Sequence, residues 1–194
     1  MHVKTRGLIG SFSLPRGFKL VNEELGGHGD NWMFVYAIDD AESASITASY
    51  RGFPVLELRA DPFRELLIGG DSIVFSKKDG INTEKIPLIS RVLGNAGDNQ
   101  LNNPDKGKFG PAFEIEDAVI LNVAKKAVLK VDGFFHDENM NPISFFSGIF
   151  IDGSPKNSKC DVEEFYFQAK TEELFKKYSS SFEESLESIV WVNR

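Results

Sequence analysis

Apolar and polar positions alternate most clearly near the C-terminal end of the sequence. The alternation over residues 162–169 favours a β-strand, and the spacing over 171–178 and 181–191 favours two helices. One apolar face of the second helix would pack on a sheet. That face consists of Phe182, Leu186, Ile189 and Val190. We therefore predict a strand, a short helix and a longer helix in this order.

The start of the longer predicted helix has a capping signal. Ser181 is followed three residues later by Glu184, which is the spacing of a capping box. Glu183, Glu184 and Glu187 would point away from the apolar face. These three glutamates are candidates for an acidic contact surface.

Strand-like patterns separated by turn residues fill most of the remaining chain. The strongest hairpin signal is Asp79-Gly80, because this dipeptide tolerates a type I′ turn. Pro87 would lie near the end of the strand that follows. A helix over 118–131 is the alternative to strands there, but the β-branched residues favour strands. The predicted strands are 8–14, 18–21, 32–38, 45–50, 72–78, 81–88, 113–123, 127–135 and 143–151.

Three segments interrupt the strand pattern, namely one predicted helix and two predicted loops. Asp61, Pro62 and a glycine at position 69 predict a short helix over 62–68. Residues 26–31 predict a glycine-rich loop. Residues 94–111 are rich in glycine and asparagine, and a loop of this length is either functional or mobile.

The composition is that of an ordinary folded chain, with 41% hydrophobic residues and 17 phenylalanines among 194 residues. This length suits one sizeable core. We therefore predict a single α+β domain over 1–194, in which helices cover an antiparallel sheet in an α/β/α sandwich-like arrangement.

The formal net charge of −7 disfavours nucleic acid and membrane surfaces as partners, because both attract basic patches. We expect instead another protein with a basic surface. Residues 1–22 carry only basic charges, whereas 161–194 carry eight carboxylates. The acidic region is either solvated charge or a docking face. No signal peptide or transmembrane span is apparent near the N-terminus, so we expect a cytoplasmic protein.

Motifs that bind cofactors or perform common catalysis are missing from the sequence. It has no phosphate loop, dinucleotide fingerprint, metalloprotease motif or nucleophile elbow, so we expect no cofactor. The three histidines, His2, His28 and His136, are too scattered to suggest a metal site. His28 lies close to Asp30 and could act as a general base, but a turn is favoured because no nucleophile is nearby.

Three further features have structural interpretations. Asp137, Asn139 and Asn141 have the alternate spacing of a calcium loop, but Pro142 and Gly148 replace its required glycine and closing glutamate. This segment predicts a hairpin tip. Cys160 is the only cysteine, so it forms no intramolecular disulfide, and next to the carboxylate of Asp161 it is not expected to be reactive. Trp32 and Trp191 are expected in the core or at a sheet edge.

The pattern of core residues from Ala127 onward resembles the second half of the Mog1/PsbP-like family. The matching positions are Val131-x-Gly133-Phe134, Ser144-Phe145-Phe146, Phe165-x-Phe167-x-Ala169, Phe175, Phe182 and Ser185-Leu186-x-Ser188-Ile189. The opening residues 12–18 are similar to the start of that family. The resemblance implies an antiparallel sheet between helices and a non-catalytic role, such as binding partner proteins or chaperoning effectors. It covers about the last third and a short fragment, and it carries over no functional residue. The loop 94–111 and the helix 62–68 lie outside it.

The sequence thus favours a non-catalytic protein-binding module, either an immunity or antitoxin-type inhibitor or an adaptor or chaperone for a secreted effector. The alternatives are a small-ligand-binding protein or enzyme with a pocket near His28, and a structural subunit of a larger assembly. The candidate contact residues are Asp98, Leu101, Asp105, Phe109, Glu183, Glu184 and Glu187.

Overall fold

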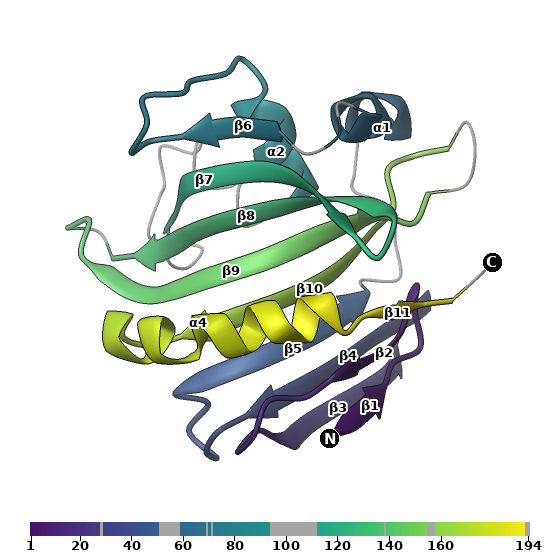
Figure 1. Cartoon of the computed structure of the whole chain (residues 1–194), viewed down its shortest axis with the longest axis vertical. Coiled ribbons are helices and arrows are strands. Elements are labelled where there is room, and N and C mark those ends of the chain that lie inside the picture. The colour runs from purple at the N-terminus through teal and green to yellow at the C-terminus, as the bar shows by residue number, and fades with distance from the viewer. Residues whose placement is uncertain are drawn as a thin grey trace.

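An eight-stranded antiparallel sheet forms the centre of the molecule (Figure 1). The structure is a computed structural model, and it describes residues 1–27, 29–50, 59–68, 70, 72–93, 112–137, 139–154 and 158–192. In spatial order the strands are β3 (Lys19–Gly27), β4 (Gly29–Ala37), β5 (Ala44–Tyr50), β10 (Val162–Ala169), β9 (Pro142–Asp152), β8 (Lys126–His136), β7 (Ala112–Val123) and β6 (Ser72–Ser76).

The sheet consists of two meanders joined at one pair of strands. Strands β3 to β5 pair in sequence order, and so do β6 to β10. The junction is the antiparallel pair β5 and β10, in which Phe165 lies opposite Ala48. A second, three-stranded sheet contains β1 (His2–Lys4), β2 (Ile9–Ser13) and β11 (Val190–Trp191), with β2 in the middle.

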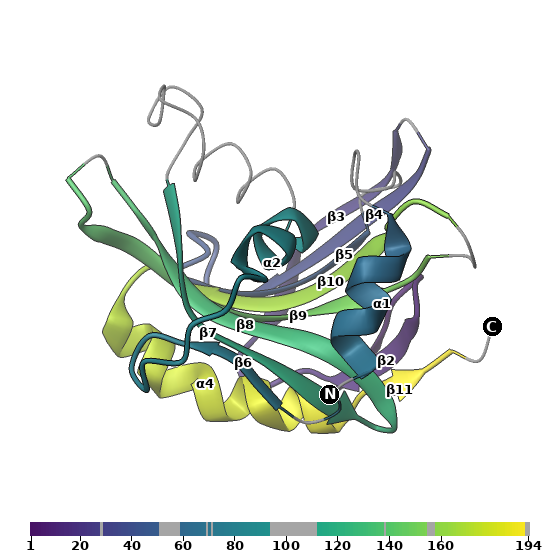
Figure 2. The same cartoon turned by 90° about the horizontal axis from the view of Figure 1, so that it is seen from above.

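Each face of the large sheet has its own cover. Helices α1 (Ala60–Ile68) and α2 (Ile86–Val92) lie on one side, and α4 (Glu172–Glu187) with the small sheet lies on the other (Figure 2). Phe165 and Phe167 of β10 are fully buried and pack against Phe182 of α4. On the opposite side, Phe63 of α1 is fully buried in a second apolar cluster. The predicted α+β class is therefore confirmed.

Helix α4 is one continuous helix, so the prediction of two helices is wrong. Its N-cap is Thr171, whose hydroxyl oxygen accepts a hydrogen bond from the backbone N–H of Leu174. Ser181 lies within the helix and forms no capping box at its start. Ile189 is buried beyond the helix end, whereas Val190 belongs to β11 and is 54% exposed.

Two other predictions are wrong. The predicted loop at 26–31 is mostly strand, because β3 extends to Gly27 and β4 begins at Gly29. The predicted strand 81–88 is reduced to a single bridge between Ser76 and Ile81. Helix α2 follows, with proline in its first turn, where the missing N–H is tolerated. The burial of Ile89 against the second apolar cluster stabilises this helix.

The remaining predicted strands and the helix at 62–68 are confirmed, with ends shifted by a few residues and β3 much longer than expected. Strands rather than a helix cover 118–131. Trp32 is buried, and the indole N–H of Trp191 donates to the backbone carbonyl of Val123 at 2.8 Å. The loop predicted at 94–111 lies outside the described residues. No helix in the described ranges combines the length and apolar character needed to cross a membrane.

The predicted hairpin tip between β8 and β9 is confirmed. The carboxylate of Asp137 accepts hydrogen bonds from the backbone N–H groups of Asn139 and Asn141, at 2.8 and 2.9 Å. The hydrogen bonds from the side chain and backbone of Asn141 lower the pKa of Asp137. The polar residues of this segment thus stabilise the turn itself.

Candidate functional site

Three neighbouring inner strands of the large sheet each contribute one large side chain to a row, which lies toward one end of the strands. Trp32 of β4 lies opposite Tyr50 of β5, and Tyr50 lies opposite Glu163 of β10. Residues in register on adjacent strands share a face, so all three side chains lie on the face covered by α4 and the small sheet. This row forms one wall of a pocket.

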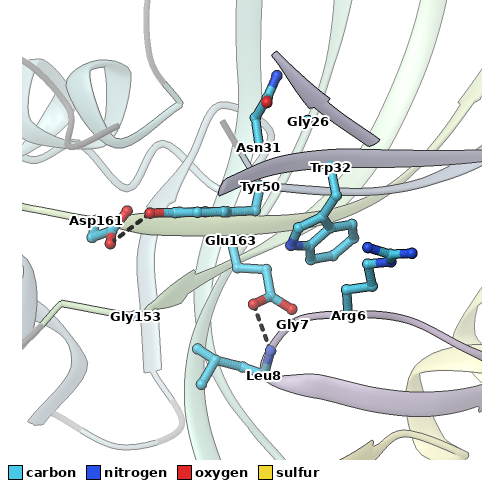
Figure 3. Close-up of a pocket in the computed structure, with 10 residues that line it drawn as sticks. All are labelled: Arg6, Gly7, Leu8, Gly26, Asn31, Trp32, Tyr50, Gly153, Asp161 and Glu163. Atoms are coloured by element: carbon cyan, nitrogen blue, oxygen red, sulfur yellow. Dashed lines mark hydrogen bonds between the residues drawn. The ribbon is translucent and has the colours of Figure 1, made fainter. Parts of the chain in front are cut away.

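The pocket has a volume of about 460 Å³ and opens at the junction of the two sheets. The turn between β1 and β2 contributes one side of it, and the ends of β3, β4, β5, β9 and β10 contribute the rest (Figure 3). This size is within the range of sites for small molecules or single side chains. The described lining residues are Arg6, Gly7, Leu8, Gly26, Asn31, Trp32, Tyr50, Gly153, Asp161 and Glu163.

Glu163 attaches the small sheet to the large one. It is only 4% exposed, and its carboxylate accepts hydrogen bonds from the backbone N–H groups of Leu8 at 2.6 Å and Ile9 at 3.0 Å. A buried charge is tolerated where hydrogen-bond donors satisfy it. Gly7 is required beside this carboxylate, because a Cβ at that position would overlap the Glu163 side chain.

Asp161 supplies a second carboxylate on the same side of β10. It lies two positions before Glu163, and alternate residues of an extended chain point the same way. The hydroxyl of Tyr50 donates to Asp161 Oδ2 at 3.0 Å, and the backbone N–H of Asp161 donates to Ser154 Oγ at 2.7 Å. Both carboxylates of the pocket are thus held in place by neighbouring groups.

The rim of the pocket is less constrained than its floor. Arg6 is exposed and forms no ion pair within the described part of the chain, and its side chain extends beside Trp32 in Figure 3. The enclosed Oδ1 atom of Asn31 has no hydrogen-bond partner among the described residues. The pocket therefore combines two carboxylates, an amide oxygen and an indole ring, which favour a cationic group that donates hydrogen bonds, and Arg6 is the cationic side chain among its described lining residues.

The described pocket residues offer carboxylates and a phenol as their titratable acidic groups. None of them is a serine, threonine, cysteine, histidine or lysine. Cys160 precedes Asp161 but is buried. This burial raises the pKa of the Cys160 thiol to about 12, and the nearby carboxylates of Asp152 and Asp161 make a smaller contribution in the same direction. The thiol is therefore protonated at neutral pH and a poor nucleophile.

Of the contact residues predicted from the sequence, the three glutamates of α4 do not line this pocket. Glu183 of α4 forms a 2.8 Å ion pair with Lys130 of β8. Glu184 and Glu187 are exposed on the same helix and remain available to a partner. The other four candidates lie outside the described residues, as do His28 and the side chain of Asp30. These four are Asp98, Leu101, Asp105 and Phe109.

Comparison with protein-family models, with curated protein sequences and with solved structures found no match to this chain. The Mog1/PsbP-like resemblance therefore stays a prediction.

Proposed function

We propose that this chain is a non-catalytic protein-binding module and that its pocket receives a basic side chain of the partner. The observation that carries the proposal is the pair of carboxylates of Asp161 and Glu163 beneath an opening lined by Trp32. A guanidinium or ammonium group that enters the pocket would meet negative charge at the floor and an aromatic ring at the wall.

The charge of the whole chain supports the same kind of partner. A net charge of −7 attracts a basic protein and increases the rate of encounter. Glu184 and Glu187 extend this negative charge to the outer surface of α4. Glu183 contributes less, because Lys130 neutralises it. Among the sequence-based hypotheses, an immunity or antitoxin-type inhibitor and an adaptor for a secreted effector both fit a stable module of this charge.

A direct test uses N-acetyl-arginine amide as a probe and the corresponding citrulline derivative as its uncharged control. We expect the arginine probe to bind in the millimolar range and to shift the indole resonance of Trp32 in NMR spectra. The citrulline probe should bind much more weakly, because it lacks the charge. Equal binding of both probes, or no binding of either, would contradict the proposal.

Two variants of the chain test whether the arginine probe binds in the pocket. Asp161→Asn removes one charge with little change in shape, and it should weaken binding of the arginine probe about tenfold. Glu184→Gln is the matched control, because it removes one charge outside the pocket. If both variants weaken binding equally, the effect comes from the overall charge and the pocket is not the site.

Capture of the natural partner tests the proposal on the whole protein. We expect one stoichiometric partner from native-host lysate, with less partner retained at higher salt and less on the Asp161→Asn variant. Charge reversal of Glu184 and Glu187 should slow its association. Association that is unchanged in both variants and at both salt concentrations would contradict an electrostatic partner.

A small-molecule ligand is the second candidate, and the pocket volume of about 460 Å³ favours it. A basic amine of the size of an amino acid would satisfy the same groups. A thermal-shift screen of small amines separates the two cases, since a small-molecule site should bind one amine far more tightly than the arginine probe.

A further inference from the structure

Strand β3 forms one edge of the large sheet. Its hydrogen-bonded neighbour is β4, and among the described strands none lies on its outer side. A nine-residue strand in this position leaves alternate backbone N–H and C=O groups able to pair with another chain. The opposite edge, β6, has only five residues, and its end already pairs with Ile81.

The side chains of β3 give this edge an acidic character. Glu23 and Glu24 are exposed and, as neighbours in a strand, lie on opposite faces. Neither forms an ion pair within the described ranges. Leu20 and Leu25 flank them and are 46% and 42% exposed. The edge thus combines two carboxylates with two accessible apolar side chains.

The same charges argue against a second copy of this chain as the neighbour. Two β3 strands paired edge to edge would bring four carboxylates close together, and like charges on paired strands are destabilising. Irregular register between Leu20 and Asn22 and between Leu25 and Gly27 leaves a short regular segment at 22–25. A short extended segment with basic side chains satisfies both the backbone groups and the charges.

We infer that β3 is the docking edge for an extended basic segment of the partner protein, which adds to the large sheet as a further strand. Backbone hydrogen bonds would supply most of the affinity, and Glu23 and Glu24 would select lysine or arginine at neighbouring positions. The inference rests on the proposed function for the charge of the partner. The two acidic side chains lie outside the pocket, because Glu23 and Glu24 do not line it, although Gly26 at the end of the same strand does.

The test uses two capped peptides derived from residues 19–27, one with the natural sequence and one with lysine in place of both glutamates. We expect the basic peptide to bind the chain and the natural, acidic peptide not to bind. Binding should weaken about tenfold between low and physiological salt, because exposed charges are screened. In NMR spectra the shifted and exchange-protected amides should belong to β3.

Charge reversal supplies the control. The double variant Glu23→Lys, Glu24→Lys should exchange the preference, so that it binds the acidic peptide and no longer the basic one. Two N-methylated forms of the peptide, methylated at one or the other set of alternate residues, should differ. Binding should be abolished in the form whose methyl groups replace the N–H donors that face β3. The Asp161→Asn variant should bind the basic peptide normally, which separates failure at the edge from failure at the pocket.

Three outcomes would overturn the inference. Binding of neither peptide shows that the edge does not accept a strand. Amide shifts confined to the pocket show that the peptide binds there. Self-association of the unmodified chain through β3 in sedimentation measurements shows that the neighbour is a second copy.

Discussion

The backbone N–H of Leu8 donates a 2.6 Å hydrogen bond to the carboxylate of Glu163, although the two residues are 155 positions apart in the sequence (Figure 3). The bond joins the turn between β1 and β2 to β10, an inner strand of the large sheet. Because Leu8 and Glu163 both line the pocket, the same bond helps to shape it.

Replacement of Glu163 by glutamine should destabilise the fold. The amide can accept one of the two backbone hydrogen bonds, but its NH2 group then faces the second N–H donor. We expect a loss of about 1.5–3 kcal/mol in the free energy of unfolding, as for a hydrogen bond to a charged group. Urea denaturation measures this loss. Glu184→Gln, on the exposed side of α4, should change stability by less than about 0.5 kcal/mol.

Gly7→Ala should also destabilise the fold, because the new methyl group would overlap the Glu163 carboxylate. We expect a cost of about 1–3 kcal/mol, which is typical of overpacking. The cost should fall in a Glu163→Ala background, where the overlapping group is gone, and a double-mutant cycle measures this coupling. Gly153→Ala is the control, because its Cβ would have only ordinary contacts. Equal costs at both glycines would contradict the close approach.

Lys130 should stabilise the fold at neutral pH, and this stabilisation should be lost at alkaline pH. It is 14% exposed and forms ion pairs with Asp132 and Glu183. Burial alone would lower its pKa, but the two carboxylates outweigh burial and raise the pKa above the ordinary value for lysine. The stabilisation is therefore fully present below the unfolded-state pKa of about 10.4 and is lost as the pH rises through the higher folded-state pKa.

The measurement compares the natural chain with Lys130→Met across this pH range. At pH 7 the variant should be less stable, because Asp132 and Glu183 lose their cation, and the difference should shrink above about pH 11. Lys176→Met removes an exposed pair with Glu172 and should change stability by less than about 0.5 kcal/mol at every pH. A difference that does not vary with pH would show that Lys130 acts only through packing.

Sequence reasoning predicted the elements whose signal is local. The alternation over 162–169 predicted β10, and Asp61 with Pro62 predicted α1, because strand periodicity and helix-start chemistry act over a few residues. Asp61 lies in the first turn of α1 and not at its N-cap, because the helix begins at Ala60. Sequence reasoning failed where tertiary packing decided the outcome. The apolar run at 86–92 has no decisive period, and burial of Ile89 and Val92 on the sheet makes it a helix.

The pocket could not be found in the same way. Asp161 and Glu163 have the spacing of two residues on one face of a strand, and this was the available signal. Their meeting with Arg6 and Trp32 depends on how the small sheet lies on the large one. No local pattern encodes that arrangement, because it results from contacts between distant strands.

The small sheet also has a consequence for the order of folding. The hydrogen bond from the backbone N–H of Ser13 to Ser188 Oγ spans 175 positions, and β2 pairs with β11 across a similar distance. Closing so long a loop costs entropy before any contact compensates it, so we expect such contacts to form after the meanders that bring them together. On this expectation the pocket is assembled late, and a nascent or partly unfolded chain does not yet contain it.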